Sequence, residues 1–236
     1  MKISLIIPAY NEEKYLPVCL EYVERHRTPD MLEIIVIDNA STDRTAEVAR
    51  KFKNVKVVRE ENKGLTYARA RGLLEAKGDI LAYIDADTQM PSGWLETISR
   101  EFEKNPRLVG LSGPYVYYDL TRFENMAVAF YWMLALPIYW ILGYMMVGGN
   151  FAAKKSALIA MGGFDTTIAF YGEDTNIARR LYTQGKVKFN RHFRMYTSGR
   201  RLRKEGITKT AVTYILNYLS EALFHKQATK EYKDIR

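Results

Sequence analysis

The chain has 236 residues with 47% hydrophobic side chains, a length that predicts one domain with a sizeable core, or one domain with an appendage. Its formal net charge of +8 suits an anionic membrane or a phosphorylated substrate; nucleic acid is excluded as a partner because no helix-turn-helix, zinc-knuckle or single-strand-binding pattern accompanies the charge. The single cysteine, Cys19, excludes an internal disulfide and is expected in the core.

Short apolar runs alternate with helical patterns in the first third of the chain. Strands are expected at residues 3–7, 33–37, 55–58 and 78–84, and helices at 13–25, 43–52 and 65–76. The first two strands lack polar alternation, as in a parallel sheet covered on both faces. This order predicts a doubly wound α/β fold, whose ligands bind beyond the carboxyl ends of the strands. Because the chain opens with a strand and shows no signal-peptide pattern, its functional face is expected in the cytosol.

Two carboxylates, Asp85 and Asp87, stand one residue apart after the fourth expected strand. Like charges at the end of a buried strand repel each other and lose hydration, so a positive partner has to compensate them. Mg²⁺ or Mn²⁺ bridging to a phosphate is the usual partner of two hard oxygen ligands beside an anionic substrate. Surface turns also carry this pair, so its place at a strand end decides in favour of a metal.

An uncharged stretch follows at residues 127–147, within a hydrophobic segment that covers 126–148. Its length approaches the roughly 20 residues that cross a bilayer, but Pro137 lies near its middle and its aromatic residues are scattered rather than gathered at both ends. Two arrangements stay open. One is a re-entrant or interfacial hairpin, bent at Pro137, that enters the membrane surface; the other is a buried helix pair that forms one wall of the binding cleft.

Two motifs follow the apolar stretch. Gly148 and Gly149 permit close backbone approach and could shape the floor of a site, or could form a turn before a strand at residues 151–153. Glu173 and Asp174 open a helical pattern. Acidic side chains there either complement the helix dipole or belong to a reaction centre.

The last part of the chain combines positive charge with a helical apolar pattern. Residues 200–206 hold a basic cluster, and apolar residues recur at helical spacing from 208 to 225. This combination suits an anionic membrane surface, or else the helix closes the core and its charges are solvated. Residues 201–236 are expected to form a basic amphipathic extension of a domain that covers residues 1–200.

The ordered motifs of the chain resemble the inverting GT-A glycosyltransferases of family 2. The motifs are PAYNE at 8–12, VIDNASTD at 36–43, DAD at 85–87, GGFD at 162–165 and GED at 172–174. The resemblance covers Ser4 to about Gly185, and Asn39 departs from it, since many relatives have a second Asp there. It implies a GT-A fold, a mixed and mostly parallel sheet flanked by helices, and a metal-dependent transferase that uses a nucleoside-diphosphate sugar.

The resemblance also implies roles for the matching residues. Asp38 would hydrogen-bond the nucleotide base and Tyr10 would pack against it, while Asp85 and Asp87 would hold Mn²⁺ or Mg²⁺ on the diphosphate. Asp174 would take the proton from the acceptor hydroxyl, and Glu173 would position the acceptor. The full donor-binding set is expected to be Pro8, Ala9, Tyr10, Glu12, Asp38, Arg69, Asp85, Ala86, Arg200 and Arg201.

Three basic residues beyond the acidic pair have open assignments. Arg200 and Arg201 are expected to bind the diphosphate of either the donor or the acceptor, because a guanidinium holds phosphate oxygens in pairs. His192 is either a third metal ligand or a structural residue.

The expected function is that of a metal-dependent inverting glycosyltransferase, peripheral or monotopic on the cytoplasmic face of a membrane. It would transfer sugar from a nucleoside-diphosphate sugar to a hydroxyl of a lipid-linked acceptor, in glycolipid or surface-polysaccharide synthesis. One alternative is transfer to polyprenyl phosphate, whose ionised oxygen needs no base, so Asp174 argues against it. Another is a non-catalytic nucleotide-sugar-binding protein at the membrane periphery, which the four retained carboxylates Asp38, Asp85, Asp87 and Asp174 disfavour.

Overall fold

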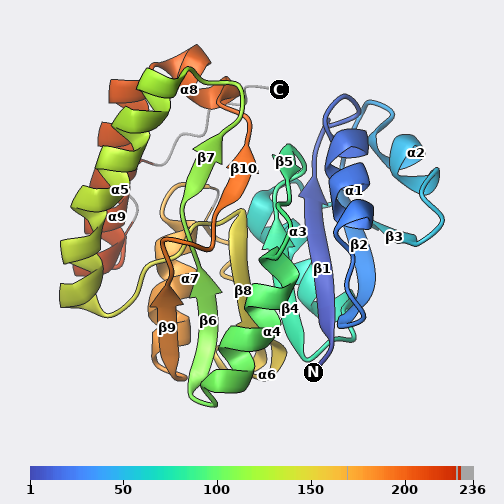
Figure 1. Ribbon diagram of the computed structural model, residues 1–236, viewed down its shortest axis with the longest axis horizontal. Coiled ribbons are helices and arrows are strands. Elements are labelled where there is room, and N and C mark those ends of the chain that lie inside the picture. Colours follow the sequence, from blue (N-terminus) through green and yellow to red (C-terminus); the bar gives the residue numbers. More distant parts are fainter. Residues whose placement is uncertain (169, 227, 230–236) are drawn as a thin grey trace.

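The computed structural model describes residues 1–168, 170–226 and 228–229; Figure 1 shows its elements. The strands are β1 (Ile3–Ala9), β2 (Met31–Asn39), β3 (Val55–Glu60), β4 (Ile80–Ile84), β5 (Thr88–Gln89), β6 (Leu108–Ser112), β7 (Tyr115–Tyr117), β8 (Asn150–Lys154), β9 (Lys186–Phe189) and β10 (Met195–Thr197). The helices are α1 (Leu16–Arg25), α2 (Thr45–Arg50), α3 (Leu65–Glu75), α4 (Trp94–Lys104), α5 (Arg122–Leu142), α6 (Lys155–Ala160), α7 (Glu173–Tyr182), α8 (Arg200–Glu205) and α9 (Ile207–Phe224). The expected C-terminal extension falls partly on residues 227 and 230–236, which lie outside the described residues.

A seven-stranded sheet forms the centre of the molecule, in the order β3-β2-β1-β4-β8-β6-β9. β8 runs antiparallel to both of its neighbours, and the other pairings in this sheet are parallel. The expected fold class, a mixed and mostly parallel α/β sheet flanked by helices, is therefore confirmed. Ala9 of β1 pairs with Asp38 of β2, so the ends of these strands meet at one edge of the sheet.

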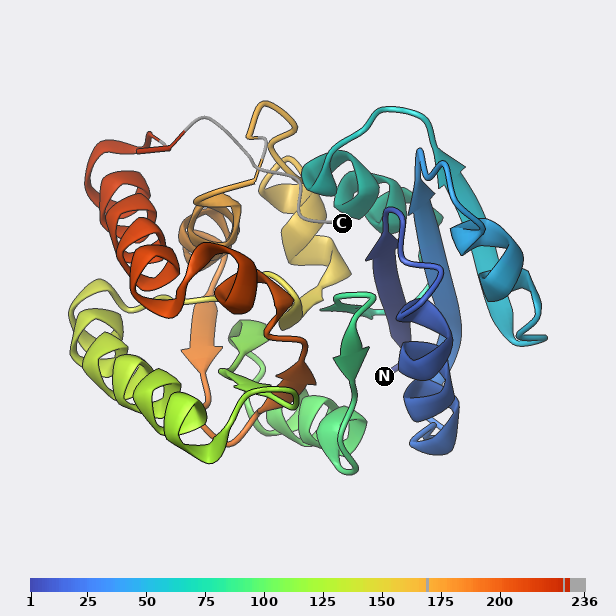
Figure 2. The ribbon, with the colours of Figure 1, turned by 90° about the horizontal axis from the view of Figure 1, so that it is seen from above.

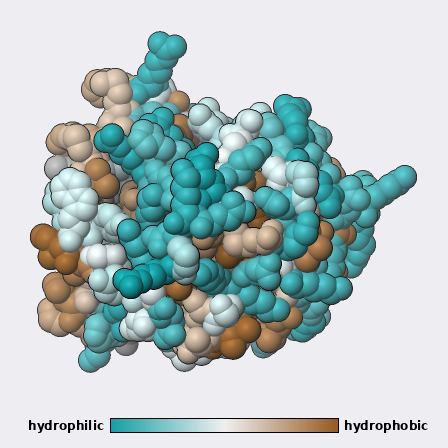
Figure 3. All heavy atoms as spheres, turned by 60° about the horizontal axis from the view of Figure 1, so that its bottom comes forward, coloured by the Kyte–Doolittle hydropathy of each residue, from teal (hydrophilic) through white to brown (hydrophobic). Residues whose placement is uncertain are grey.

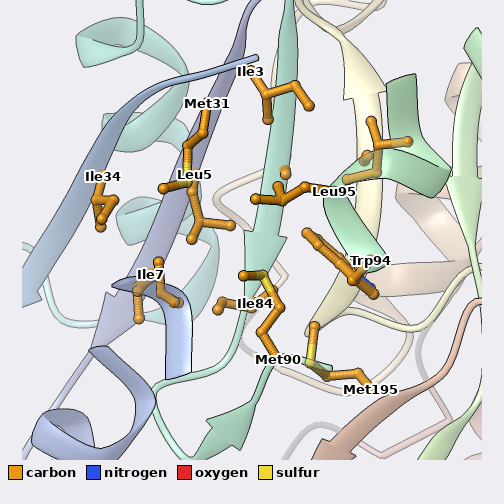
Figure 4. Packing of buried hydrophobic residues seen from close by; sticks show 14 of the residues in the cluster. Ile3, Leu5, Ile7, Met31, Ile34, Ile84, Met90, Trp94, Leu95 and Met195 are labelled. Carbon is orange, nitrogen blue, oxygen red and sulfur yellow. The ribbon is translucent and has the colours of Figure 1, made fainter. Parts of the chain in front are cut away.

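Hydrophobic clusters cover the two faces of this sheet. One cluster, seen at close range in Figure 4, contains Leu5 and Ile7. The other contains Ile6 together with Tyr83 and Phe151, whose rings stack at 4.7 Å. Successive side chains of a strand point to opposite faces, so β1 supplies both clusters. This double burial explains why its sequence is apolar without alternation.

β1 is longer than expected at its carboxyl end. Pro8 was expected to stop the strand, yet β1 continues through it to Ala9. The pairing of β1 with β4 ends earlier, at Ile6 and Tyr83. The missing N–H of Pro8 therefore leaves no partner on β4 unsatisfied. Cys19 is buried in the core, as expected.

Most of the uncharged segment lies in one continuous helix, α5, so neither the expected hairpin nor the expected helix pair forms, although α5 does line the cavity. α5 begins at a capping box between Thr121 and Glu124 and ends at Gly143, whose φ is +79°. Only 6% of its most apolar 18-residue window is buried. Pro137 is exposed, and its missing N–H costs a single helical hydrogen bond, so the other bonds carry the helix past it.

By length and composition alone, α5 is the one helix in the described part of the chain that could cross a bilayer. Figures 1 and 2 show α5 and α9 along one side of the molecule, away from β1, β2 and β3. Both ends of α5 return to the same domain, through β7 and β8. α5 therefore does not place the residues before it and the residues after it on opposite sides of a membrane.

A second sheet of three short strands, in the order β5-β10-β7, was not expected. It stands beside the carboxyl end of β4. From this sheet the Tyr115 hydroxyl donates to Asp85 at 2.8 Å and the Thr197 hydroxyl donates to Asp87 at 3.3 Å. The small sheet thus positions the two carboxylates that follow β4.

Candidate active site

A cavity of about 400 Å³ lies where the carboxyl ends of β1 and β4 meet helices α5, α7 and α9. Ten of the predicted site residues line it: Pro8, Glu12, Arg69, Asp85, Ala86, Asp87, Glu173, Asp174, Arg200 and Arg201. Ala9, Tyr10 and Asp38 lie at the adjoining ends of β1 and β2 and do not line the cavity. A more open depression near Pro106 and Gly185 contains none of the predicted residues.

Asp85 is held in place but stays accessible. Its Oδ2 accepts the Tyr115 hydrogen bond, and its Oδ1 lies 4.0 Å from Nη2 of Arg69, while 36% of the side chain is exposed. The backbone at Gly149 passes so close that an added Cβ would overlap both Asp85 Oδ2 and the Tyr115 hydroxyl. A glycine is therefore required there by close approach rather than by an unusual φ.

Asp87 is more enclosed and is paired with Arg200. Nη2 of Arg200 lies 3.1 Å from Asp87 Oδ2, and 11% of the Asp87 side chain is exposed. The same guanidinium contacts both carboxylate oxygens of Glu12, at 2.9 Å for the Nη1–Oε2 bond. Arg200 thus joins two acidic side chains that come from β1 and β4, and it compensates charges that would otherwise repel.

Arg69, like Arg200, compensates the charges of neighbouring carboxylates, here those of Asp85 and Glu173. Its side chain is 1% exposed and forms an ion pair with Glu173. An added Cβ at Gly148 would lie 2.5 Å from Glu173 Oε1 and 2.8 Å from Arg69 Nη2. Burial raises the pKa of Glu173 to about 7, against the opposing effect of the Arg69 charge. The two glycines line the cavity and also form the turn before β8, so both expectations for them hold.

Asp174 has a different environment from its neighbour Glu173. It follows Gly172, which caps α7 with φ of +80°, and its Oδ1 accepts a hydrogen bond from the Thr175 N–H at 2.8 Å. Burial raises its pKa, which the Thr175 bond opposes. The charge of Asp174 acts on the phenols of Tyr214 and Tyr218. Asp174 therefore bonds to its own helix and lies within electrostatic reach of the cavity's phenols, whereas Glu173 pairs with Arg69.

The loops after β1 and β2 are tied together beside the cavity. Asn11 has a left-handed backbone with φ of +51°, and its side chain accepts from the Thr42 N–H at 2.9 Å. Asp38 is 3% exposed and pairs with Arg59 at 2.7 Å. The Tyr10 hydroxyl accepts from Lys63 at 2.8 Å, and the ammonium lies 4.0 Å from the ring centre. Tyr10 and Asp38 therefore have basic neighbours.

Asn39 holds the loop that carries Lys63. Its Nδ2 donates to the Asn62 carbonyl at 2.7 Å, and its Oδ1 accepts from the Gly64 N–H at 2.8 Å. A carboxylate could not donate the first of these bonds. The departure from the family pattern at position 39 therefore has a structural cause.

Sequence reasoning missed Tyr115, Thr197 and Lys63, and it misplaced His192. His192 is exposed on the segment between β9 and β10, where its Nε2 accepts from the Arg191 Nε at 3.3 Å. From this part of the chain Thr197, not His192, reaches Asp87. The only local signal for Tyr115 was the strand preference of the Tyr-Val-Tyr run after Pro114, which is too short to show a period.

Comparison with known proteins agrees with this geometry. The model of the family described as "Glycosyl transferase family 2" matches residues 4–164, more than half of the chain. A glucosyl-dolichyl phosphate glucuronosyltransferase of Haloferax volcanii is 26% identical over 215 residues, which cover 83% of this chain and 68% of that protein. A dolichyl N-acetyl-alpha-D-glucosaminyl phosphate 3-beta-D-2,3-diacetamido-2,3-dideoxy-beta-D-glucuronosyltransferase of Methanococcus voltae is 33% identical over 122 residues, which cover 47% of this chain and 38% of that protein.

Solved structures show the same fold. A mannosyltransferase from Pyrobaculum calidifontis, in complex with GDP-Man and Mn²⁺, has a TM-score of 0.71 and 19% identity over 97% of this chain and 66% of that one. Glucosyl-3-phosphoglycerate synthase from Mycobacterium tuberculosis, in complex with Mn²⁺, UDP-Glc and phosphoglyceric acid, has a TM-score of 0.65 and 21% identity over 94% of this chain and 79% of that one. At these identities, both similarities concern the fold alone, a GT-A sheet flanked by helices.

Proposed function

The chain belongs to glycosyl transferase family 2, and from this premise we propose that it transfers a sugar from a nucleoside diphosphate to a hydroxyl of a lipid-linked acceptor, with inversion. That it is a glycosyltransferase follows from the family, which also removes the alternative of a non-catalytic binding protein. The groups that share one cavity carry the proposal. Asp85, Asp87 and Asp174 line it together with apolar side chains of α5 and α9.

The carboxylate pair fits a divalent metal held jointly with a diphosphate. Among the described residues no three His, Cys, Asp or Glu side chains gather to hold an ion by themselves. Mg²⁺ and Mn²⁺ sites of this kind use one or two carboxylates and complete their coordination with substrate phosphates. Asp85 and Asp87 would supply the protein oxygens, and the metal would neutralise charge on the departing diphosphate. The two structures bound to Mn²⁺ and nucleotide sugars support this choice.

Asp174 is the proposed base. It takes the proton of the acceptor hydroxyl as that oxygen attacks the anomeric carbon, and the bond to the diphosphate oxygen breaks on the opposite face of the sugar. Its raised pKa keeps it a better proton acceptor than an ordinary aspartate. Glu173 holds Arg69 beside Asp85, so we assign it to the donor end rather than to the acceptor. Arg200 lies where its charge stabilises the leaving diphosphate.

The nucleotide is proposed to bind at the ends of β1 and β2. Tyr10 would pack against the base and Asp38 would bond to it, with Pro8, Ala9 and Glu12 shaping the adjoining backbone. The ion pair of Asp38 with Arg59 fixes the carboxylate in one orientation. Lys63 is added to this set because it covers the Tyr10 ring.

Two observations support a lipid-linked acceptor at a membrane surface. The Haloferax and Methanococcus relatives carry dolichyl phosphate in their names, and α5 exposes large apolar side chains (Figure 3). Transfer to polyprenyl phosphate itself remains the second candidate within the class. The half-buried base in front of the apolar wall favours a hydroxyl acceptor, which has a proton to lose.

Substitution of the base tests the proposal. Asp174→Asn keeps the size of the side chain but cannot take the proton, so turnover should fall by about 10²–10⁴-fold with donor affinity nearly unchanged. Glu96→Gln is the matched control, because Glu96 is an exposed carboxylate in the first turn of α4. Loss of donor binding in Asp174→Asn, with single-turnover chemistry intact, would show that Asp174 is a donor ligand.

A further inference from the structure

A buried asparagine, Asn150, lies directly behind the two carboxylates that follow β4. It is the first residue of β8, it is 0% exposed, and it pairs in register with Ile84, the last residue of β4 before Asp85. Asn150 does not line the cavity, and the reaction proposed above does not use it. Burial of an amide is costly unless its polar atoms are hydrogen-bonded, so the partners of Asn150 indicate what it does.

The orientation of the Asn150 amide is fixed by Trp94, the first residue of α4. The indole N–H donates to Oδ1 of Asn150 at 3.0 Å. Because an indole can only donate, the amide oxygen has to face it. The amide nitrogen therefore donates to the backbone carbonyls of Gly113 at 3.0 Å, Pro114 at 3.4 Å and Phe193 at 2.8 Å. The Trp94 ring also stacks on the Phe193 ring, with centres 4.8 Å apart.

The three carbonyls lie just before two strands of the small sheet. Pro114 precedes β7, and Phe193 lies two residues before β10; the two strands run side by side (Figure 1). An added Cβ at Gly113 would lie 2.0 Å from the Phe193 carbonyl oxygen, so a glycine is needed for both carbonyls to reach one amide. Among the described strands, neither β7 nor β10 pairs with the seven-stranded sheet. The Asn150 amide thus ties the start of both strands to β8.

From these starting points the two strands reach the carboxylates. Tyr115 opens β7 and donates to Asp85 at 2.8 Å, and Thr197 ends β10 and donates to Asp87 at 3.3 Å. We propose that Asn150 is a positioning residue for the metal site. Its amide fixes β7 and β10 against β8, and the two hydroxyls then hold the carboxylates in the arrangement that a shared divalent ion requires.

Asn150 itself touches neither metal nor substrate in this proposal. A buried hydrogen-bond network with every member satisfied is rigid, and loss of the groups that orient metal ligands lowers metal affinity by about 10- to 100-fold. This inference rests on the proposed function, since it concerns the metal that this function requires.

Two variants of the network are compared by Mn²⁺ binding. Asn150→Asp keeps the shape and the acceptor for Trp94, but it turns the donors that face three carbonyls into acceptors. Trp94→Phe keeps an aromatic ring and removes only the N–H that orients the amide. Free Mn²⁺ is followed by electron paramagnetic resonance in the presence of UDP, GDP, dTDP, CDP or ADP. Mn²⁺ affinity should fall at least about tenfold in Asn150→Asp and about two- to tenfold in Trp94→Phe.

Ser4→Ala is the matched control. Ser4 is fully buried on β1, at the end of that strand away from the carboxylates. Its hydroxyl donates to Glu33 at 2.7 Å and accepts from the Gly78 N–H at 2.8 Å. This variant should lower the thermal unfolding temperature and leave Mn²⁺ affinity unchanged, because a structural hydrogen bond alone does not orient the metal ligands.

Two results would overturn the proposal. One is wild-type Mn²⁺ affinity in Trp94→Phe and in folded Asn150→Asp; if Asn150→Asp does not fold, Trp94→Phe decides by itself. The other is an equal loss of Mn²⁺ affinity in Ser4→Ala, which would make the effect one of general stability.

A double-mutant cycle tests the route through the two hydroxyls. Tyr115→Phe with Thr197→Val removes both donors to the carboxylates, and this pair is then combined with Trp94→Phe. The combined loss of Mn²⁺ affinity should be smaller than the product of the separate losses, because the last change acts on contacts that are already absent. A combined loss equal to the product would show that Trp94 affects the metal by another route, against the proposal.

Failure of this inference can be told apart from failure of the proposed function. If the wild type binds Mn²⁺ together with a nucleoside diphosphate and the network variants bind it equally well, only the role of Asn150 is wrong. If the wild type binds Mn²⁺ with none of these nucleotides, the proposed function is contradicted, and the role of Asn150 with it.

Discussion

Gly149→Ala tests whether close backbone approach holds Asp85, a proposed metal ligand, in place. Gly149 has no left-handed φ, so alanine meets no penalty of that kind, and the three atoms nearest to the added Cβ all belong to the Asp85 carboxylate and the Tyr115 hydroxyl. Relief of this overlap requires a shift of at least about 1 Å in a site packed as closely as a protein core. Such a shift breaks the 2.8 Å hydrogen bond from Tyr115 to Asp85.

The expected loss can be calculated in two ways. A hydrogen bond to a charged acceptor contributes about 1.5–3 kcal/mol, which corresponds to a loss of roughly 10- to 150-fold in affinity. A misplacement of about 1 Å in a reacting site costs on the order of 10²-fold. We therefore expect Mn²⁺-dependent binding of the preferred nucleoside diphosphate to weaken by about 30- to 100-fold, measured by isothermal titration calorimetry.

Gly110→Ala is the control for this substitution. An added Cβ at Gly110 would lie 3.2 Å from the terminal methyl group of Met146, which can move, and Gly110 is in β6 away from the carboxylates. This variant should keep wild-type affinity. Nearly wild-type donor binding by Gly149→Ala, with the fold intact by circular dichroism, would refute the reasoning, because Asp85 would then not need its present position.

Three further variants test other parts of the molecule. Asp87→Ala should abolish Mn²⁺-dependent donor binding while the fold survives, since it removes a metal ligand and a repelling charge; full activity of this variant in EDTA would exclude the metal. Asn39→Asp should raise the donor KM about tenfold, because one hydrogen bond to the Lys63 loop is replaced by a repulsion; an unchanged KM would mean that this loop does not contact the donor. Trp140→Asp with Ile141→Asp should release the protein from anionic liposomes, since each exposed side chain loses about 1.5–3 kcal/mol of burial in lipid. Cosedimentation of this double variant at wild-type levels would show that the outer face of α5 is not the contact. The test uses Trp140 and Ile141 because both are exposed. Trp132 would not serve, because its ring stacks on Phe189 and its substitution would disturb the packing inside the protein.

The donor half of the fold was predictable from local sequence. β1, β2 and β4 are continuous apolar runs that end next to polar motifs, and the shared edge of parallel strands brings those motifs together. This reasoning placed Asp85 and Glu12 in one cavity. It gave the wrong carboxyl end for β1, at Pro8, because the last residue of a strand depends on where the neighbouring strand ends.

The acceptor half was less predictable because it depends on long-range pairing. β7 and β10 have three residues each, too few for a periodic signal, and their register alone brings Tyr115 and Thr197 to the carboxylates. The opposite directions of Glu173 and Asp174 depend on the position of Arg69, 104 residues away from Glu173 in sequence. No local pattern encodes such a distance.

The path of the chain around α5 has a consequence for how this protein can diversify. Between Tyr117 and Asn150 the chain adds no strand to the seven-stranded sheet, and it leaves and rejoins the body at two neighbouring points of the site. Changes within α5 can therefore accumulate without disturbing β1, β2 or β4. Under the proposed function, the helix on the acceptor side lies outside the strands that carry the donor site, so substitutions in α5 can change the acceptor without changing the donor.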